Sequence, residues 1–241
     1  MSERSPDSHD ASNALMDLRT VSRYLRVPEE VVVRLVQTGD LPGDRVSSHW
    51  RFQKTVIDSW LTARIQSAET KDLAEVLKMN EPLIPIPTLI SPDRVVLNLQ
   101  PGTKRKVLTQ LVRPLLMTSV VSDAANFLVS LLDREAMVST ALCDGIAIPH
   151  VRDQETSGIK ETCVVLGICP EGTDFDALDG EKTYLFFLVC ARTTSEHLRL
   201  LAKLTLLVRQ PQIVQKFCDC TTKEQVIDLI VNSHISLSML I

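Results

Sequence analysis

Aromatic residues are scarce in this chain of 241 residues, at 4% of the sequence, although hydrophobic residues make up 44%. The hydrophobic core therefore has to be built mainly from Leu, Val and Ile. No apolar run approaches the ~20 residues that a membrane-spanning helix needs, so the sequence predicts no membrane insertion. A charged fraction of 23% is ordinary for a globular chain of one or two domains.

The six cysteines and five histidines lack the spacing of a metal site. Cys218 and Cys220 lie two positions apart, one short of the zinc-binding Cys-x-x-Cys spacing. The first residues also lack a secretory leader, so the cysteines are expected to be reduced thiols in a cytoplasmic protein. We therefore predict no metal, no cofactor and a cytoplasmic location.

Composition divides the chain into four predicted parts. Residues 1–14 are polar and have no hydrophobic periodicity, which predicts a disordered tail. Residues 15–64 form a predicted compact helical domain. Residues 65–90 are predicted to be a helix and an extended linker, because four prolines crowd the stretch EPLIPIPTLISP. Helical and strand patterns alternate over 91–241, which indicates an α/β domain.

Charge is distributed unevenly over these parts. Residues 15–64 carry eight Lys/Arg and six Asp/Glu, a formal charge of +2, which leaves −6 for the rest of the chain. Domains of opposite net charge favour different partners. We therefore expect the two halves to bind different molecules.

The pattern over 15–64 is typical of a winged helix-turn-helix. DLRTVSRYLRV predicts a short helix, and PEEVVVRLVQTG predicts a second helix with Pro28 at its first position. Gly39 follows the second helix, where the chain needs a residue with positive φ. LPGDRVSSHWRF predicts a tight hairpin, and KTVIDSWLTARI a closing helix.

Residues 18–61 resemble the small excisionase-type, MerR-related DNA-binding domain, most closely in TGDLPGDRV and HWRFQKTVIDSWL. The resemblance implies that the second helix enters the major groove of double-stranded DNA, while the hairpin wing contacts the backbone or the minor groove. It assigns Arg34 to the groove, and Arg45 and Arg51 to phosphates.

Two acidic residues depart from that family at the start of the second helix. Glu29 and Glu30 complement the helix dipole, but they repel phosphates at the point of approach. Two interpretations therefore stand: DNA binding, or a helix-turn-helix fold kept for protein contacts. A predicted helix over 70–79 with one apolar face offers a surface for a homodimer, an arrangement common among DNA-binding domains of this type.

A histidine follows a short buried strand predicted in STALCDGIAIPH. The apolar run 146–148 lies between Gly145 and Pro149, and Pro149 should end the strand because it has no backbone donor. His150 is then expected to be half-exposed at the end of the strand. An imidazole with the ordinary pKa of ~6.5 is largely neutral at cytoplasmic pH, and its nitrogen can attack phosphorus.

A second histidine opens the helix predicted in TTSEHLRLLAKLTLLV. Thr193 and Glu196 have the spacing of a capping box, which places His197 in the first turn. The helix dipole there favours an anion and disfavours imidazolium, so a neutral His197 can donate a hydrogen bond to a phosphoryl oxygen. The two histidines together are a more specific signal than either alone.

Residues 88–236 resemble the enzyme IIA domain of the fructose/mannitol and nitrogen-related phosphotransferase systems. The matching words are LLDREAMVSTALCDGIAIPH, CPEGTDFDALDGEKTYLFFLVCA and SEHLRLLAKLTLLV. The resemblance implies a fold of class α/β, with a mixed β-sheet flanked by helices. It also implies that an upstream carrier protein passes a phosphoryl group to the domain without a metal.

By this resemblance, His150 matches the phosphoryl acceptor and His197 the assisting histidine. Arg134 matches the arginine that stabilises the phosphoryl oxygens as charge spreads over them. Thr140 matches a hydroxyl near the site, and a threonine at a strand edge explains that residue equally well.

One position beside the acceptor departs from the family. Val151 replaces the usual glycine, and we expect its β-branched side chain to crowd the docking of the carrier. The following Arg152 keeps the basic character of the position. The departure therefore indicates retuning of the site rather than its loss.

We predict a regulatory phosphotransferase component with a phosphohistidine intermediate on His150. It receives the phosphoryl group from a phosphorylated HPr-like or NPr-like carrier and couples it to the helix-turn-helix domain, to control transcription or metabolism through a target protein or DNA. The alternative is a sugar-transport IIA component that passes the group to a separate IIB subunit and uses the helical domain for protein docking. A binding-only module fits least, because both histidines and Arg134 are present.

Overall fold

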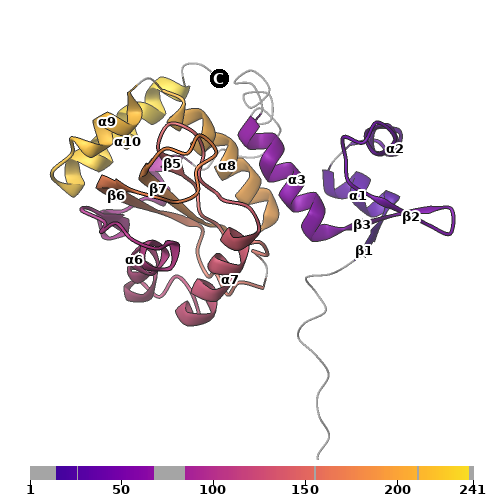
Figure 1. Ribbon diagram of the computed structural model, residues 1–241, viewed down its shortest axis with the longest axis horizontal. Coiled ribbons are helices and arrows are strands. Elements are labelled where there is room, and N and C mark those ends of the chain that lie inside the picture. The colour runs from indigo at the N-terminus through magenta and orange to yellow at the C-terminus, as the bar shows by residue number, and fades with distance from the viewer. Residues whose placement is uncertain (1–14, 26, 68–84, 155, 211, 239–241) are drawn as a thin grey trace, which may run out of the picture. The chain divides into compact units, whose positions relative to one another are not determined.

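The computed structural model separates into two compact units, Met1–Arg64 and Ile65–Ile241 (Figure 1). It describes the whole chain except residues 1–14, 26, 68–84, 155, 211 and 239–241. The predicted tail and the predicted helix over 70–79, with its dimer surface, lie outside the described residues. In the described part of the chain, no helix combines the length and the apolar character that crossing a membrane requires.

The N-terminal unit combines helices with a small antiparallel sheet in the order β1-β3-β2. The sequence pattern did not predict β1, which forms because Met16 pairs with Phe52 and both side chains are buried in the core of this unit. The elements are β1 (Leu15–Asp17), α1 (Leu18–Leu25), α2 (Glu29–Gln37), β2 (Asp44–Val46), β3 (His49–Gln53) and α3 (Lys54–Ser67).

Turn residues define the helix-turn-helix and its wing. Gly39 has a φ of +78° just after α2, which confirms the predicted helix end. Pro28 precedes α2 as its N-cap residue instead of occupying the first helical position, and its carbonyl accepts the N–H of Val31 at 3.0 Å. Ser47 and Ser48 join β2 to β3 with φ of 47° and 71°, as a two-residue hairpin of type I′ requires.

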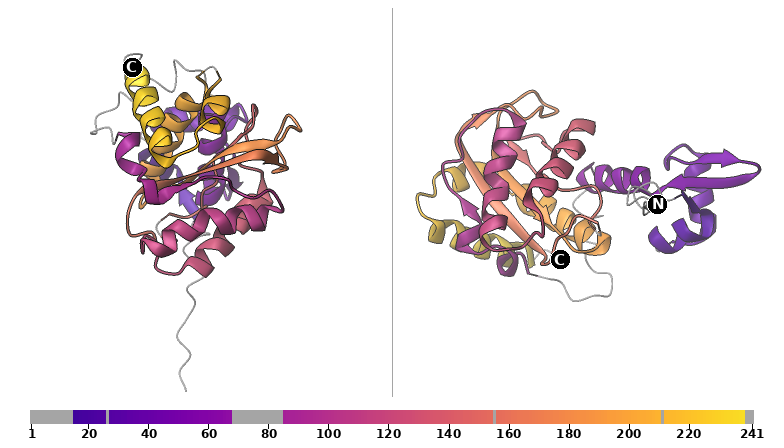
Figure 2. Two further views of the ribbon diagram at one scale, coloured as in Figure 1. Left: turned by 90° about the vertical axis from the view of Figure 1, so that its left-hand side faces the viewer. Right: turned by 90° about the horizontal axis from the view of Figure 1, so that it is seen from below.

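The C-terminal unit is a mixed four-stranded sheet in the order β4-β6-β7-β5, which confirms the predicted α/β fold class. The pairs β4–β6 and β5–β7 are parallel, and β6–β7 is antiparallel. Helices α6 and α7 cover one face, and α8, α9 and α10 cover the other (Figure 1; Figure 2). The elements are α5 (Ile86–Leu89), the 3₁₀ turn Pro92–Arg94, β4 (Val95–Val96), α6 (Lys104–Met117), α7 (Ala124–Met137), β5 (Ile146–Ala147), β6 (Cys163–Thr173), β7 (Thr183–Cys190), α8 (Thr194–Val208), α9 (Ile213–Cys218) and α10 (Lys223–Ser238).

The central strands β6 and β7 are buried on both faces. Val164 and Leu166 of β6 pack into the layer of α8 and α10, whereas the alternate residues Cys163 and Val165 pack into the layer of α6 and α7. Side chains of a strand point to opposite faces in turn, so a strand between two helical layers needs apolar residues throughout. The unbroken apolar runs CVVLGIC and YLFFLVC follow from this position.

Residues 86–89 form a short helix, α5, in place of the extended linker expected from the prolines. Pro85 caps this helix and Pro87 lies in its first turn, where a backbone N–H has no helical partner and proline is tolerated. Ile86 and Leu89 are buried in the same core layer as α8 and α10. Residues 85–92 of the proline-rich stretch therefore belong to the C-terminal unit.

Gly167 of β6 generates a stability prediction. A Cβ at this position would lie 2.5 Å from Cδ2 of Leu111 and 2.8 Å from Cδ1 of Leu99, and both leucines are fully packed. We expect Gly167→Ala to lower the free energy of unfolding by ~1–3 kcal/mol, as overpacking does, in a urea titration. The control Leu178→Ala, at a side chain that is 82% exposed, should change it by less than ~0.5 kcal/mol. Unchanged stability of the Gly167 variant would contradict this close packing of Leu99 and Leu111.

Candidate functional site

His150 lies on a continuation of strand β5 along β7. The N–H of Val189 donates to the carbonyl of Pro149 at 2.9 Å, and a parallel bridge pairs His150 with Val189. Pro149 removes a donor but keeps its acceptor, so the pairing does not stop there as predicted. His150 is consequently buried, with 2% exposure, and the expectation of a half-exposed histidine is wrong.

The ring of His150 is held as a specific neutral tautomer. Its Nδ1 lies 2.8 Å from the carbonyl oxygen of Ile148, which can only accept a hydrogen bond, so Nδ1 carries the proton. Nε2 keeps its lone pair and has no hydrogen-bond partner among the described residues. Burial lowers the pKa of His150 well below 6.5, and the unfavourable interaction of a protonated ring with His197 and with the guanidinium of Arg134 lowers it further. The site therefore presents a neutral imidazole with a nucleophilic Nε2.

His197 faces His150 from the start of α8. The two ring centroids are 4.7 Å apart, and the ring planes are tilted by 50°. Burial, together with the nearby charge of Arg134, lowers the pKa of His197 to about 3, so this ring is neutral as well. Its Nδ1 is buried without a hydrogen-bond partner among the described residues. The structure thus brings together the two histidines that the sequence singled out.

Only one of the two hydrogen bonds of the predicted capping box forms at the start of α8. The Thr193 hydroxyl accepts the N–H of Glu196 at 3.2 Å, as predicted. The Glu196 carboxylate, however, accepts the N–H of Arg192 and the hydroxyl of Thr162 instead of returning to Thr193. The N–H of His197 already donates to the Thr193 carbonyl at 3.0 Å, so it is not a free helix-end donor. What His197 offers the site is its side chain.

Two guanidinium groups add positive charge beside the histidines. Arg134, near the end of α7, is buried, and its charge lowers the pKa of both His150 and His197. Burial lowers the pKa of Arg134 itself, the Glu135 carboxylate partly offsets this, and the charge of Arg152 lowers it further. Among the described residues neither arginine forms an ion pair, and Nε of Arg152 is buried without a partner. Such a cluster is suited to an anion with several oxygens.

Arg152 was noted in the sequence only for its basic character, and the structure makes it a neighbour of Arg134. Its Nη1 lies 3.8 Å from Sδ of Met137 at the end of α7. The available signal was its position two residues after His150, because side chains in an extended segment alternate in direction. Val151, between them, is 1% exposed and packs into the core layer of α6 and α7. The expectation that Val151 crowds a docking carrier is therefore wrong.

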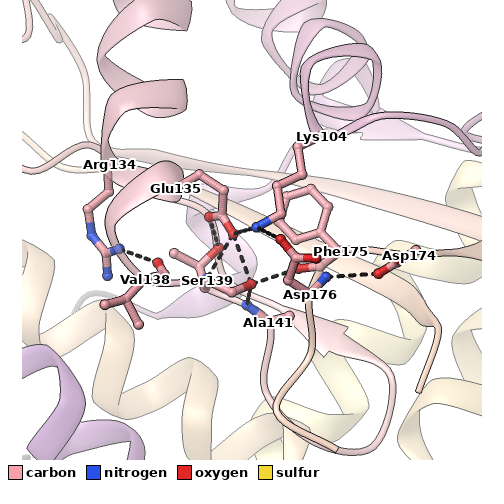
Figure 3. Close-up of polar contacts among 10 residues, drawn as sticks. Lys104, Arg134, Glu135, Val138, Ser139, Ala141, Asp174, Phe175 and Asp176 are labelled. Atoms are coloured by element: carbon pink, nitrogen blue, oxygen red, sulfur yellow. Dashed lines mark hydrogen bonds and ion pairs between the residues drawn. The ribbon is translucent and has the colours of Figure 1, made fainter. Parts of the chain in front are cut away.

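Thr140 is near the site through its backbone rather than its hydroxyl. Its Oγ1 donates to Oε2 of Glu135 at 2.6 Å, and its side chain is fully buried. Its carbonyl accepts the N–H of Ile148, which precedes His150 by two residues. Figure 3 shows Glu135 enclosed by polar groups, among them Lys104 and Ser139. Glu135 is not among the site residues predicted from the sequence, although its place next to Arg134 in LLDRE was a visible signal.

The residues assigned to DNA on helix α2 lie at its surface. Arg34 is exposed in the last turn, and Glu29 and Glu30 are exposed in the first turn. Carboxylates in the first turn stabilise the helix through its dipole. The outer face of α2 therefore presents both signs of charge.

The wing presents Arg45 and Arg51 in different surroundings. Arg45 is exposed, and its guanidinium lies 5.9 Å from the ring centre of Trp50. Arg51 is half-buried in β3, directly across from Asp17 of β1 and Asp44 of β2. Neighbouring carboxylates offset the charge that Arg51 would offer to a phosphate. Arg45 is thus the better placed of the two for a phosphate contact.

The described residues contain no group of three or more His, Cys, Asp or Glu side chains arranged to hold a metal ion. Arg134 places positive charge close to His150, and Arg152 lies close enough to Arg134 to lower its pKa. These two side chains can supply the stabilisation that developing negative charge needs.

Comparison with known families and curated proteins gives matches to both units. Residues 88–233 match the model "Phosphoenolpyruvate-dependent sugar phosphotransferase system, EIIA 2", and residues 15–65 match a helix-turn-helix domain. The nitrogen regulatory protein of Pseudomonas aeruginosa is 30% identical over 152 residues, which cover 62% of this chain and 97% of that protein. The fructose-specific EIIABC component of Bacillus subtilis is 27% identical over 151 residues, but the match spans only 23% of its length.

Solved structures agree with this assignment. The nitrogen regulatory protein IIA-Ntr of Neisseria meningitidis is 26% identical with a TM-score of 0.54, over 60% of this chain and 98% of that chain. IIA mannitol of Escherichia coli shares the fold, with a TM-score of 0.53 and 23% identity over 58% of this chain and 98% of that one. Since the family model covers more than half of its residues, the chain belongs to the EIIA 2 family of the phosphoenolpyruvate-dependent sugar phosphotransferase system, here with a helix-turn-helix domain ahead of the EIIA domain.

Proposed function

We propose that the protein accepts a phosphoryl group on Nε2 of His150 and that the state of His150 regulates the helix-turn-helix domain. A phosphorylated HPr-like or NPr-like carrier is the proposed donor. The observation that carries the proposal is the pair of buried neutral imidazoles, with ring centroids 4.7 Å apart, beside the buried guanidinium of Arg134. This combination offers a nucleophile and an anion site at one place.

The proposed transfer is a direct displacement at phosphorus. The lone pair of Nε2 forms the new N–P bond while the P–N bond of the donor phosphohistidine breaks, and the donor imidazole leaves with that electron pair. Negative charge on the phosphoryl oxygens is stabilised by Arg134 and Arg152, and by an N–H of His197. Nδ1 of His150 keeps its proton throughout and remains hydrogen-bonded to the Ile148 carbonyl.

The use made of the phosphoryl group is proposed to be regulatory. The similarity to the nitrogen regulatory protein of P. aeruginosa and the attached helix-turn-helix domain support this choice. A phosphoryl group adds a charge of about −1.5 to −2, which changes what nearby surfaces attract. Double-stranded DNA is the proposed partner of the N-terminal unit, through Arg34, Arg45 and Arg51.

A second candidate is transfer to a separate IIB subunit during sugar transport. The curated relatives include a mannitol-specific IIA component of Staphylococcus aureus, 27% identical over 138 residues. Enzyme IIA mannitol of E. coli has also been solved in complex with phosphorylated enzyme IIB mannitol. In this case the helix-turn-helix domain would serve for protein docking.

The acceptor is tested by phosphorylation in vitro. Incubation with labelled phosphoenolpyruvate and the general carrier proteins should give an acid-labile label on the wild-type protein. His150→Ala should abolish the label, because the nucleophile is gone. His49→Ala, at an exposed histidine of the wing, is the matched control and should be labelled normally. Acid-labile label on the His150 variant would refute the assignment.

The depressed pKa values predict a pH dependence of stability. Below pH 6.5 the unfolded chain protonates His197, but the folded chain does not until about pH 3. The unfolded state then binds more protons, so the free energy of unfolding falls as the pH falls through this window, by up to ~1.4 kcal/mol per pH unit for each such histidine. Urea titrations at pH 7.5 and 5.5 should show the loss, and His197→Gln should reduce it. An equal loss in both proteins would contradict a neutral, buried His197.

DNA binding is tested with both phosphorylation states side by side. We expect salt-dependent binding to a duplex, and a different affinity once His150 is phosphorylated. Arg45→Gln should weaken binding and lower the slope of log K against log salt by ~0.9, as loss of one phosphate contact does. Arg113→Gln, at an exposed site on α6, is the charge-matched control. Absence of salt-dependent binding to any duplex would favour the protein-docking alternative.

A further inference from the structure

Glu135 is a buried carboxylate that the proposed chemistry does not use. It follows Arg134 in α7 and is only 3% exposed. Its Oε1 accepts from Thr140 N at 3.0 Å, Ser139 Oγ at 3.0 Å and Lys104 Nζ at 3.2 Å, and its Oε2 accepts from Thr140 Oγ1 at 2.6 Å (Figure 3). A buried carboxylate is costly unless it is paired and hydrogen-bonded in this way. The Glu135 carboxylate is therefore held in a specific hydrogen-bonded site.

Lys104 balances the charge of Glu135 from the start of α6. Its Nζ also lies 2.8 Å from Oδ2 of Asp176 and 5.2 Å from the ring centre of Phe175. Burial by itself lowers the pKa of Lys104, but the bonds to Asp176 and Glu135 outweigh it and raise the pKa. The one hydroxyl proton of Ser139 is shared between Glu135 Oε1 and the carbonyl oxygen of Phe175, which lies 2.7 Å from Oγ. One network thus ties together α6, the end of α7 and the loop after β6.

A line of hydrogen bonds runs from Glu135 to the ring of His150. Glu135 holds Thr140 at both its N–H and its hydroxyl. The carbonyl of Thr140 accepts the N–H of Ile148 at 3.1 Å. The carbonyl of Ile148 in turn accepts Nδ1–H of His150 at 2.8 Å. The last bond selects the tautomer that leaves Nε2 free.

The same segment also holds Arg134. Its Nη1 donates to the carbonyl of Val138 at 2.7 Å, as Figure 3 shows. Val138 directly precedes Ser139 and Thr140, which Glu135 fixes in place. A displacement of this segment would therefore move the guanidinium and the acceptor ring together.

We propose that Glu135 is a positioning residue, which sets the orientation of His150 and Arg134 through residues 138–140, with Lys104 as its counter-ion. The inference rests on the proposed function, since it concerns how the acceptor and the anion-binding guanidinium are held. A merely stabilising ion pair would leave the tautomer of His150 unchanged once the protein is folded. The His150 tautomer therefore separates the two roles.

The experiment measures the tautomer and the phosphorylation rate in the same full-length variants. Histidine ¹⁵N spectra should show the Nδ1–H form of His150 in the wild type, and a mixture with the Nε2–H form in Glu135→Gln. The phosphorylation rate of this variant should fall by roughly ten- to a hundredfold, the scale of a misplaced reacting group. Asp176→Asn is the matched control, because it removes a carboxylate from Lys104 but keeps every bond of Glu135. It should react within about twofold of the wild type.

A second pair of variants decides the matter if Glu135→Gln does not fold. Thr140→Val keeps the side-chain shape but loses the bond to Oε2, and Thr140→Ser restores the hydroxyl. We expect the valine variant to shift the tautomer and slow the reaction, and the serine variant to recover both. A wild-type tautomer and rate in folded Glu135→Gln, or in Thr140→Val, would overturn the inference. Failure of the wild type to be labelled would instead refute the proposed function, and the tautomer measurement does not depend on labelling.

Discussion

The backbone pairing of residues 146–150 with β7 is the constraint on which the candidate site depends. It carries the chain past Pro149, buries His150 beside Val189, and turns Nδ1 toward the Ile148 carbonyl. Because β7 leads directly into α8, the same strand delivers His197 to the opposite side of the site. The 4.7 Å separation of the two ring centroids thus follows from this strand pairing and from the short connection, residues 191–193, between β7 and α8.

Burial and positive charge act in the same direction on the two histidines. Desolvation removes the favourable hydration of an imidazolium, and Arg134 repels a further positive charge, so both rings stay neutral. Neither Arg134 nor Arg152 lies within ion-pair distance of a carboxylate among the described residues, although Glu135 raises the pKa of Arg134 from further away. The one nearby buried carboxylate, Glu135, has its own cation in Lys104. The cluster is therefore left with an excess of positive charge, which suits the proposed phosphoryl transfer.

The N-terminal unit has the fold of a winged helix-turn-helix but a surface of mixed charge. Its helix-turn-helix and wing are built by ordinary means, with Phe52, Val21 and Val32 in the core and a tight turn at Ser47 and Ser48. Its surface is mixed in charge, since Glu29 and Glu30 accompany Arg34 on α2 and two aspartates flank Arg51. A matched family establishes the domain type, whereas the ligand depends on side chains that vary independently of the fold.

The sequence by itself determined the two-part organisation and the α/β class of the larger unit, and it singled out His150, His197 and Arg134 as candidate site residues. These predictions rest on local patterns, namely apolar runs, a helix cap, turn residues and the sequence motifs of a family. Each pattern can be recognised within a short segment of the sequence. Only the tertiary structure decided that His150 is buried rather than half-exposed, that Val151 points into the core, and that Glu135 receives the Thr140 hydroxyl. Each of these depends on which segments pack against one another across long separations in the chain, a property that no single window of sequence contains.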